Sequence, residues 1–135
     1  MKKKYSVLVA CLFGLFLLSF VPKNTSQEPW KVPDAAKNKA NPTKADAAAT
    51  IANGKSLYST HCKSCHGTKG KGDGPKASQL DTESGDFTKA SFQAQTDGTL
   101  FYKTSEGRKD MPSFKKKIAN ENDIWAVVNY LRTLK

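Results

Sequence analysis

Apolar residues recur at helical intervals in this chain, and no segment shows the strict alternation that is typical of strands. The clearest apolar stripe consists of five aliphatic residues near the C-terminus: Ile124, Val127, Val128, Leu131 and Leu134. Their spacing predicts an amphipathic helix, which Asn120 can cap and along which Trp125 and Tyr130 also lie.

Two further helices are expected before it. One begins near Asp46 and passes Leu57 before it reaches the cysteine pair at 62 and 65. A shorter one starts at Thr96 or Asp97, and Gly107 ends it. These helices all fall within residues 46–135, the expected domain, and no strand is expected in it.

The first 21 residues have the pattern of an export leader. Three lysines, Lys2 to Lys4, precede a largely apolar run from Val7 to Val21, as in a secretory signal peptide. At ~1.5 Å per residue the run is about 22 Å long, shorter than the ~30 Å hydrocarbon core of a bilayer. No clean cleavage site follows, so residues 1–21 are expected to be a signal peptide or an N-terminal membrane anchor. The protein is expected to be exported to the periplasm, soluble or held on the outer face of the inner membrane.

Residues 22–45 are rich in Lys, Asn, Ala and Pro and poor in aliphatic side chains. This composition predicts a flexible linker between the leader and the domain. Trp30 and Val32 are exceptions, and the alternative is that they dock on the folded domain.

The most informative motif is Cys62-x-x-Cys65-His66. This spacing is the attachment signature of a c-type haem, in which both thiols bond to the porphyrin and the histidine ligates its iron. A zinc site or a redox dithiol are the alternatives. Zinc needs four ligands, and the chain offers only Cys11 and His61 besides. A redox dithiol is typical of a βαβ context, which the pattern lacks.

A second axial ligand for such a haem is expected from methionine. The chain contains only Met1, in the leader, and Met111, in a predicted loop that Pro112 stiffens. Ligation by His66 and Met111 raises the reduction potential, which suits electron transfer. The alternative is that Met111 only fills apolar space.

The formal net charge of +10 suits an acidic protein partner, an anionic membrane or nucleic acid. No nucleic-acid-binding module is recognisable, and the lysines are scattered along the chain. We therefore expect redox protein partners with an acidic docking surface, no nucleic acid, and a membrane tether only through residues 1–21.

From Asp46 to Lys135 the chain resembles the class I, single-haem c-type cytochromes, in the style of bacterial oxidase-associated cytochrome c domains. The matching motifs, in chain order, are Gly54-x-x-x-Tyr58, Cys62-x-x-Cys65-His66-Gly67, Gly72-Asp73-Gly74-Pro75, Gly107-x-x-x-Met111-Pro112 and Trp125-x-x-x-x-Tyr130-Leu131. The resemblance implies an all-α fold of four to five helices around one covalent haem c, with the first and last helices crossing at Gly54. It also implies that the Pro75 carbonyl accepts a hydrogen bond from His66.

The function expected on this basis is an exported electron carrier rather than an enzyme. One alternative is a tethered electron-entry subunit of an oxidase or dehydrogenase complex. Another is a haem sensor or a peroxidase-like protein in which Met111 dissociates from the iron.

Overall fold

Helices make up all the regular secondary structure in the residues that the computed structural model describes, 28–43 and 47–135. The long helices are α3 (Ala48–His61), α6 (Asp97–Glu106) and α7 (Glu121–Leu131). The short elements are α2 (Asp34–Lys37), α4 (Lys63–His66), the 3-10 helix η2 (Ala77–Gln79) and α5 (Ala90–Gln93). The predicted all-α class is confirmed, and the short elements make the helices more numerous than expected.

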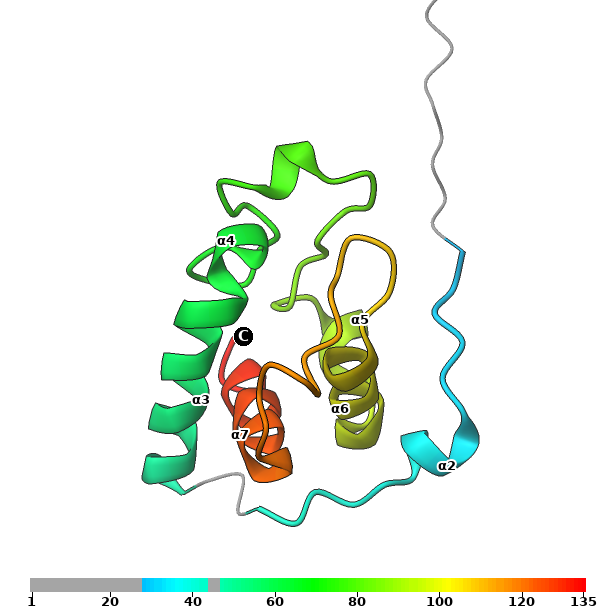
Figure 1. The fold of residues 1–135 in the computed structure, drawn as a ribbon, viewed down its shortest axis with the longest axis vertical. Coiled ribbons are helices and arrows are strands. Elements are labelled where there is room, and N and C mark those ends of the chain that lie inside the picture. The colour runs from blue at the N-terminus through cyan, green and yellow to red at the C-terminus, as the bar shows by residue number, and fades with distance from the viewer. Residues whose placement is uncertain (1–27, 44–46) are drawn as a thin grey trace, which may run out of the picture.

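The crossing of α3 and α7 is the most extensive contact between helices, and the two lie side by side in Figure 1. Gly54 makes their close approach possible. A Cβ atom at this position would lie 1.9 Å from the carbonyl oxygen of Ala126 and 3.0 Å from the Cβ of Tyr130. The predicted crossing of the first and last helices of the domain at Gly54 is therefore confirmed.

The core is built mainly on α7, of which every residue from Ile124 to Leu131 is buried. Trp125 is fully buried and stacks on Phe101 of α6, with ring centres 4.1 Å apart. Tyr58 of α3 packs on Tyr130 at 5.2 Å. Aromatic side chains thus join the three long helices, and each contributes a large buried apolar area.

The ends of α6 and α7 follow the predicted caps. The Thr96 side chain accepts a hydrogen bond from the Thr99 amide, and Asn120 accepts one from the Asn122 amide. Gly107 ends α6 with a φ of 69°, which glycine adopts without strain. α3 begins without a side-chain cap, and Asp46, the predicted cap, lies outside the described residues.

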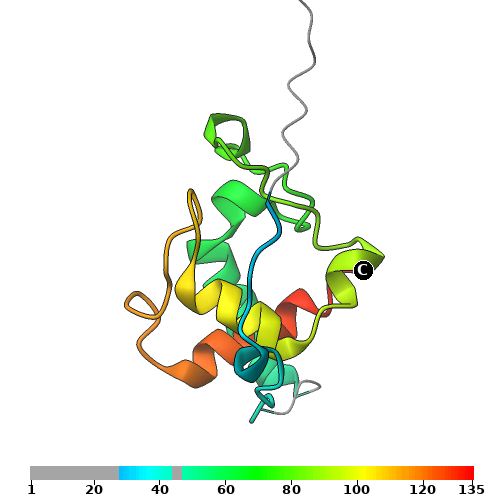
Figure 2. The same cartoon turned by 90° about the vertical axis from the view of Figure 1, so that its right-hand side faces the viewer.

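Residues 28–43 lie against the domain, beside α6 and α7 (Figures 1 and 2). The Asn41 side chain donates to Asn129 of α7 at 2.7 Å, and Asn129 in turn donates to Thr43 at 2.8 Å. Asn129 is 1 % exposed, so these bonds satisfy a buried polar side chain. For this stretch of the segment 22–45, the contacts favour docking over a free linker.

A second set of contacts ties α2 to α6. The Thr96 hydroxyl donates to the Lys37 carbonyl at 2.8 Å, and a Cβ atom at Gly98 would lie 2.2 Å from the Ala36 carbonyl oxygen. The backbone of α2 thus rests directly on the start of α6.

Within residues 28–43 and 47–135, no helix is both long and apolar enough to cross a membrane.

We predict that Gly54→Ala destabilises the domain, because the added methyl group meets the backbone of α7, which cannot move without separating the helices. The expected loss is at least the ~1–3 kcal/mol that is typical of overpacking. Denaturant unfolding of the purified protein measures it, and Ser59→Ala, on the exposed side of the same helix, is the control. Equal stability of the two variants would contradict the crossing.

Candidate functional site

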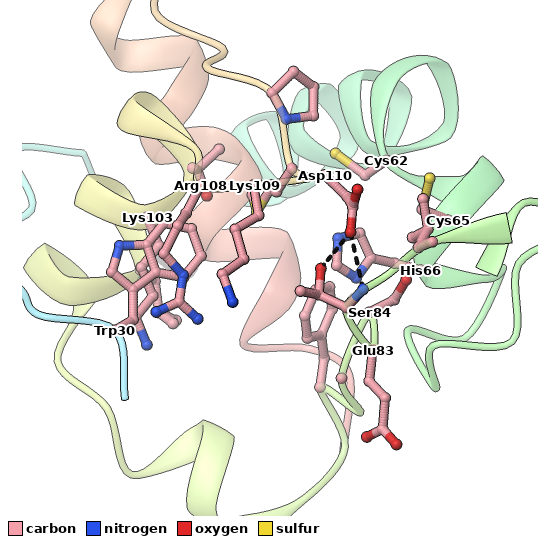
Figure 3. Close-up of a pocket in the computed structure, with 18 of the residues that line it drawn as sticks. Trp30, Cys62, Cys65, His66, Glu83, Ser84, Lys103, Arg108, Lys109 and Asp110 are labelled. Atoms are coloured by element: carbon pink, nitrogen blue, oxygen red, sulfur yellow. Dashed lines mark hydrogen bonds between the residues drawn. The ribbon is translucent and has the colours of Figure 1, made fainter. Parts of the chain in front are cut away.

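A cavity of about 370 Å³ opens between the end of α3, the middle of α6 and the loop that carries Met111 (Figure 3). Both motif cysteines, His66 and Met111 line it. Its apolar wall includes six further side chains: Leu80, Phe87, Phe92, Leu100, Phe114 and Leu131. A cavity of this size with apolar walls and a few polar groups is typical of a cofactor site.

The cysteine motif joins the end of α3 to α4. The Cys62 amide donates to the Tyr58 carbonyl at 2.9 Å and so still belongs to α3. The Cys65 and His66 amides both donate to the Cys62 carbonyl, at 3.1 and 3.0 Å. This turn brings both cysteines and the histidine to the same cavity.

Both motif cysteines are free thiols and half-buried. Burial, reinforced by the neighbouring Cys65, raises the pKa of Cys62 to about 12. The Cys62 thiol is therefore protonated at neutral pH. Neither cysteine is bound in a disulfide.

The imidazole of His66 lies among apolar rings. It stacks on Phe87 with ring centres 4.4 Å apart, and Phe87 stacks on Phe92 at 4.5 Å. Burial lowers the pKa of His66, although a hydrogen bond with the Ser84 backbone opposes the shift. The neutral ring is the form that ligates metals.

The glycine-rich loop after the motif folds back onto α4. The Gly74 amide donates to the Cys65 carbonyl at 3.2 Å, and the Lys76 amide donates to the Ser64 carbonyl at 2.9 Å. Pro75 lies between these two contacts. The structure shows no hydrogen bond on the buried Nδ1 of His66, so the contact with the Pro75 carbonyl stays a prediction.

Tyr58 ties the end of the motif to α3. Its hydroxyl is buried and donates to the Gly67 carbonyl at 2.6 Å. Gly67 has a φ of 78°, and a Cβ atom there would lie 1.8 Å from Oδ1 of Asp73. The chain therefore needs glycine directly after His66 to turn into the loop.

Met111 is presented by a tight turn after α6. Arg108 and Met111 pair across this turn, with N–H···O distances of 2.8 and 3.0 Å, and Lys109 within it has a φ of 53°. The Asp110 carboxylate accepts hydrogen bonds from the Thr82 amide and hydroxyl, at 2.9 and 2.7 Å (Figure 3). The turn is thus fastened to the loop on the other side of the cavity mouth.

The structure brings four of the five predicted site residues to one cavity: Cys62, Cys65, His66 and Met111. Pro75 does not line it. Leu80, Phe87 and Phe92 line it as well. Sequence reasoning missed the part of the wall formed by Glu28, Pro29 and Lys103, although the isolated Trp30 was a signal that this segment docks.

These residues fit a covalent haem. Two free thiols and an imidazole lie on one side, a thioether is available from a separate loop, and aromatic and aliphatic side chains form the walls. A thiolate–histidine zinc site fits less well, because no cluster of three or more His, Cys, Asp or Glu side chains suited to a metal ion occurs in the described part of the chain.

Comparison with known proteins identifies the family. The cytochrome c family model matches residues 51–135. The chain belongs to the cytochrome c family. Among curated proteins nothing matches. A solved structure, the reducing HAO-like protein complex of Kuenenia stuttgartiensis, is similar with a TM-score of 0.61 and 28% identity. The match covers 81% of this chain but only 52%, about half, of the other.

Membership of this family confirms the predicted resemblance to c-type cytochromes. It implies a covalently bound haem c and indicates an electron-transfer protein rather than an enzyme in its own right.

We predict that Tyr58→Phe destabilises the cytochrome by ~1–3 kcal/mol, because the buried Gly67 carbonyl loses its hydrogen-bond donor. Denaturant unfolding gives the loss. Tyr102→Phe, on the less buried side of α6, is the matched control and should change stability little. A Tyr58→Phe variant as stable as the control would mean that this bond does not hold the turn after His66.

Proposed function

We propose that this cytochrome is an exported carrier of single electrons between redox proteins. In the proposal Cys62 and Cys65 attach its haem, and His66 and Met111 ligate the iron. The observation that carries the proposal is that one cavity is lined by all four side chains, although Met111 lies 45 residues after His66. The family supports the haem and the electron transfer.

Each element of the site has a distinct part in this function. When bound, haem supplies the one-electron change between Fe(II) and Fe(III). The neutral His66 imidazole and the Met111 thioether would hold the iron, each through a lone pair. Because a thioether favours the reduced iron, this pair of ligands would raise the reduction potential. The aromatic wall excludes water and holds the imidazole in place.

Export is supported by the apolar run from Val7 to Val21 after three lysines. Attachment of c-type haem is compatible with an extracytoplasmic location, and residues 1–21 can serve as a cleaved signal or as a tether. Either form leaves the domain on the same side of the membrane.

A role as the electron-entry subunit of a larger complex is the second candidate. The similar solved structure is a protein complex, and this chain corresponds to about half of the matched chain.

The experiment that tests attachment compares the wild type with the double variant Cys62→Ala/Cys65→Ala after co-expression with haem-attachment machinery. Haem should stay with the wild-type polypeptide through denaturing electrophoresis and be absent from the variant. Ser64→Ala, between the two cysteines, should retain it. Haem that washes out of the wild type would overturn covalent attachment.

Met111→Leu tests the distal ligand, since leucine keeps an apolar side chain of similar size but removes the sulfur. We expect the sulfur–iron band of the oxidised protein to disappear and the reduction potential to fall. If Met111 only fills space, the spectrum and the potential will both stay unchanged. A wild-type spectrum that is high-spin would instead support a sensor or peroxidase-like function.

The exposed lysines near the motif and the Met111 turn are proposed to face an acidic partner. They are Lys63, Lys69, Lys71, Lys76, Lys109, Lys116 and Lys117. Two other cations of this region are engaged within the chain: Lys115 pairs with Glu106 at 2.6 Å, and Arg108 donates to the Glu28 carbonyl. The remaining set can raise the association rate by electrostatic steering.

Lys116→Glu should therefore slow second-order electron transfer to an acidic redox partner at low salt. The difference should shrink as ionic strength rises, because screening acts over ~8 Å at 0.15 M. Lys55→Glu, on the exposed face of α3, carries the same charge change away from the cavity and should have a smaller effect. Rates that do not depend on salt would leave these lysines as solubilising charge.

A further inference from the structure

Lys103 and Arg108, two cations of the cavity wall, both lie against the indole ring of Trp30. The Arg108 guanidinium lies 4.7 Å from the centre of the Trp30 ring, and the Lys103 ammonium lies 5.6 Å from it. Arg108 also donates to the Glu28 carbonyl at 2.9 Å, and Lys103 donates to the Gln95 side chain. Neither forms an ion pair with any carboxylate of the described residues.

No ion pair neutralises the two positive charges of this cluster. Both side chains are partly buried, and two like charges at one wall disfavour each other. Burial and the Arg108 charge lower the pKa of Lys103. The Trp30 ring offsets only part of this cost, since a cation–π contact contributes about 0.5–2 kcal/mol. A negatively charged group in the cavity would stabilise the pair.

The position of the cluster indicates which group that is. In Figure 3, Cys62, Cys65 and His66 stand at one side of the cavity, while Trp30, Lys103 and Arg108 stand at the other. The vinyl groups and the two carboxylates of haem lie on different edges of the porphyrin. A ring bonded at the cysteines would therefore direct its carboxylates away from them, toward the cations.

We propose that Trp30, Lys103 and Arg108 form the binding site for the haem carboxylates. The proposal rests on the proposed function, because it takes the haem to be attached at Cys62 and Cys65. Its new element is that a residue upstream of the family-matched region, 51–135, completes the cofactor site. The docked segment 28–43 is then a functional part of the cytochrome and not a spacer.

The contacts of that segment explain how Trp30 is held. α2 rests on α6, where the Lys37 carbonyl accepts from Thr96. The Lys39 ammonium pairs with Glu121 and lies 4.4 Å from the centre of the Phe101 ring. Since both anchors follow Trp30 closely in the chain, they place its indole at the cavity before any ligand enters.

Other titratable groups also line the cavity: Glu28, His61, Glu83, Lys109 and Asp110. The Glu28 carboxylate pairs with Lys31 at 3.8 Å. Asp110 is engaged by Thr82. A test must therefore separate the effect of the Lys103 and Arg108 cluster from theirs. These groups are present both in the wild type and in variants at Lys103. Subtracting the reduction potential of one protein from that of the other therefore removes their contribution.

The test is the reduction potential of the intact holoprotein as a function of pH, for the wild type, Lys103→Gln and Lys103→Arg. With its cation present, a haem carboxylate keeps a low pKa and stays ionised. Without it, the carboxylate pKa rises, and the carboxylate ionises within the measured range. The added negative charge stabilises oxidised iron, so the potential of Lys103→Gln should fall below that of the wild type as pH rises.

At acid pH the two potentials should converge, because the carboxylate of the variant is then neutral. Lys103→Arg should restore the wild-type profile, and Lys55→Gln, outside the cavity, should match it. A constant difference between Lys103→Gln and the wild type at every pH would overturn the proposal, since it would reflect a lost cation without a carboxylate partner. An unchanged visible spectrum in each variant separates this outcome from failure of haem attachment or of Met111 ligation.

A second measurement asks whether the cluster instead takes a free anion. The indole N–H resonance of Trp30, assigned with Trp30→Phe, is followed in the reduced holoprotein during addition of inorganic phosphate. If the haem carboxylates fill the site, the resonance should not move beyond the effect of sodium chloride at equal ionic strength. A saturable shift with phosphate would show a site open to external anions and would overturn the proposal.

Discussion

The close crossing of α3 and α7 at Gly54 is the constraint on which the rest of the structure depends. It brings the backbone of α3 against Ala126 and fixes the position of α3 relative to the buried helix α7. α3 leads directly into the cysteine motif, so the crossing also fixes the two thiols and His66. α6 packs on the same helix through the Phe101–Trp125 stack and ends at the turn that carries Met111. Two loops distant in sequence therefore meet at one cavity because their parent helices share α7.

Much of this arrangement could be predicted from the sequence, because it is encoded locally. The apolar stripe of α7 and the caps at Thr96 and Asn120 depend on residues within a few positions of each other. The crossing at Gly54 and the cavity walls at Phe87 and Phe92 depend on contacts across the chain. The crossing was predictable through family resemblance, whereas no local pattern marks the two phenylalanines as cavity walls.

The docking of residues 28–43 was harder to predict for a physical reason. Its affinity for the domain comes from polar contacts, such as those of Asn41 and Thr43 with Asn129, and from carbonyl groups of α2 that rest on Gly98. Such contacts leave no hydrophobic periodicity, and the composition resembles that of a linker. Only Trp30 and Val32 marked the segment as more than a spacer.

The account's central claim is that His66 and Met111 meet at one iron. Iron-edge X-ray absorption of the oxidised holoprotein tests it most directly, since it counts the sulfur and nitrogen atoms bound to the metal. We predict one sulfur, from Met111, with His66 and the four ring nitrogens completing the shell. A shell of nitrogen and oxygen atoms without sulfur would contradict the account.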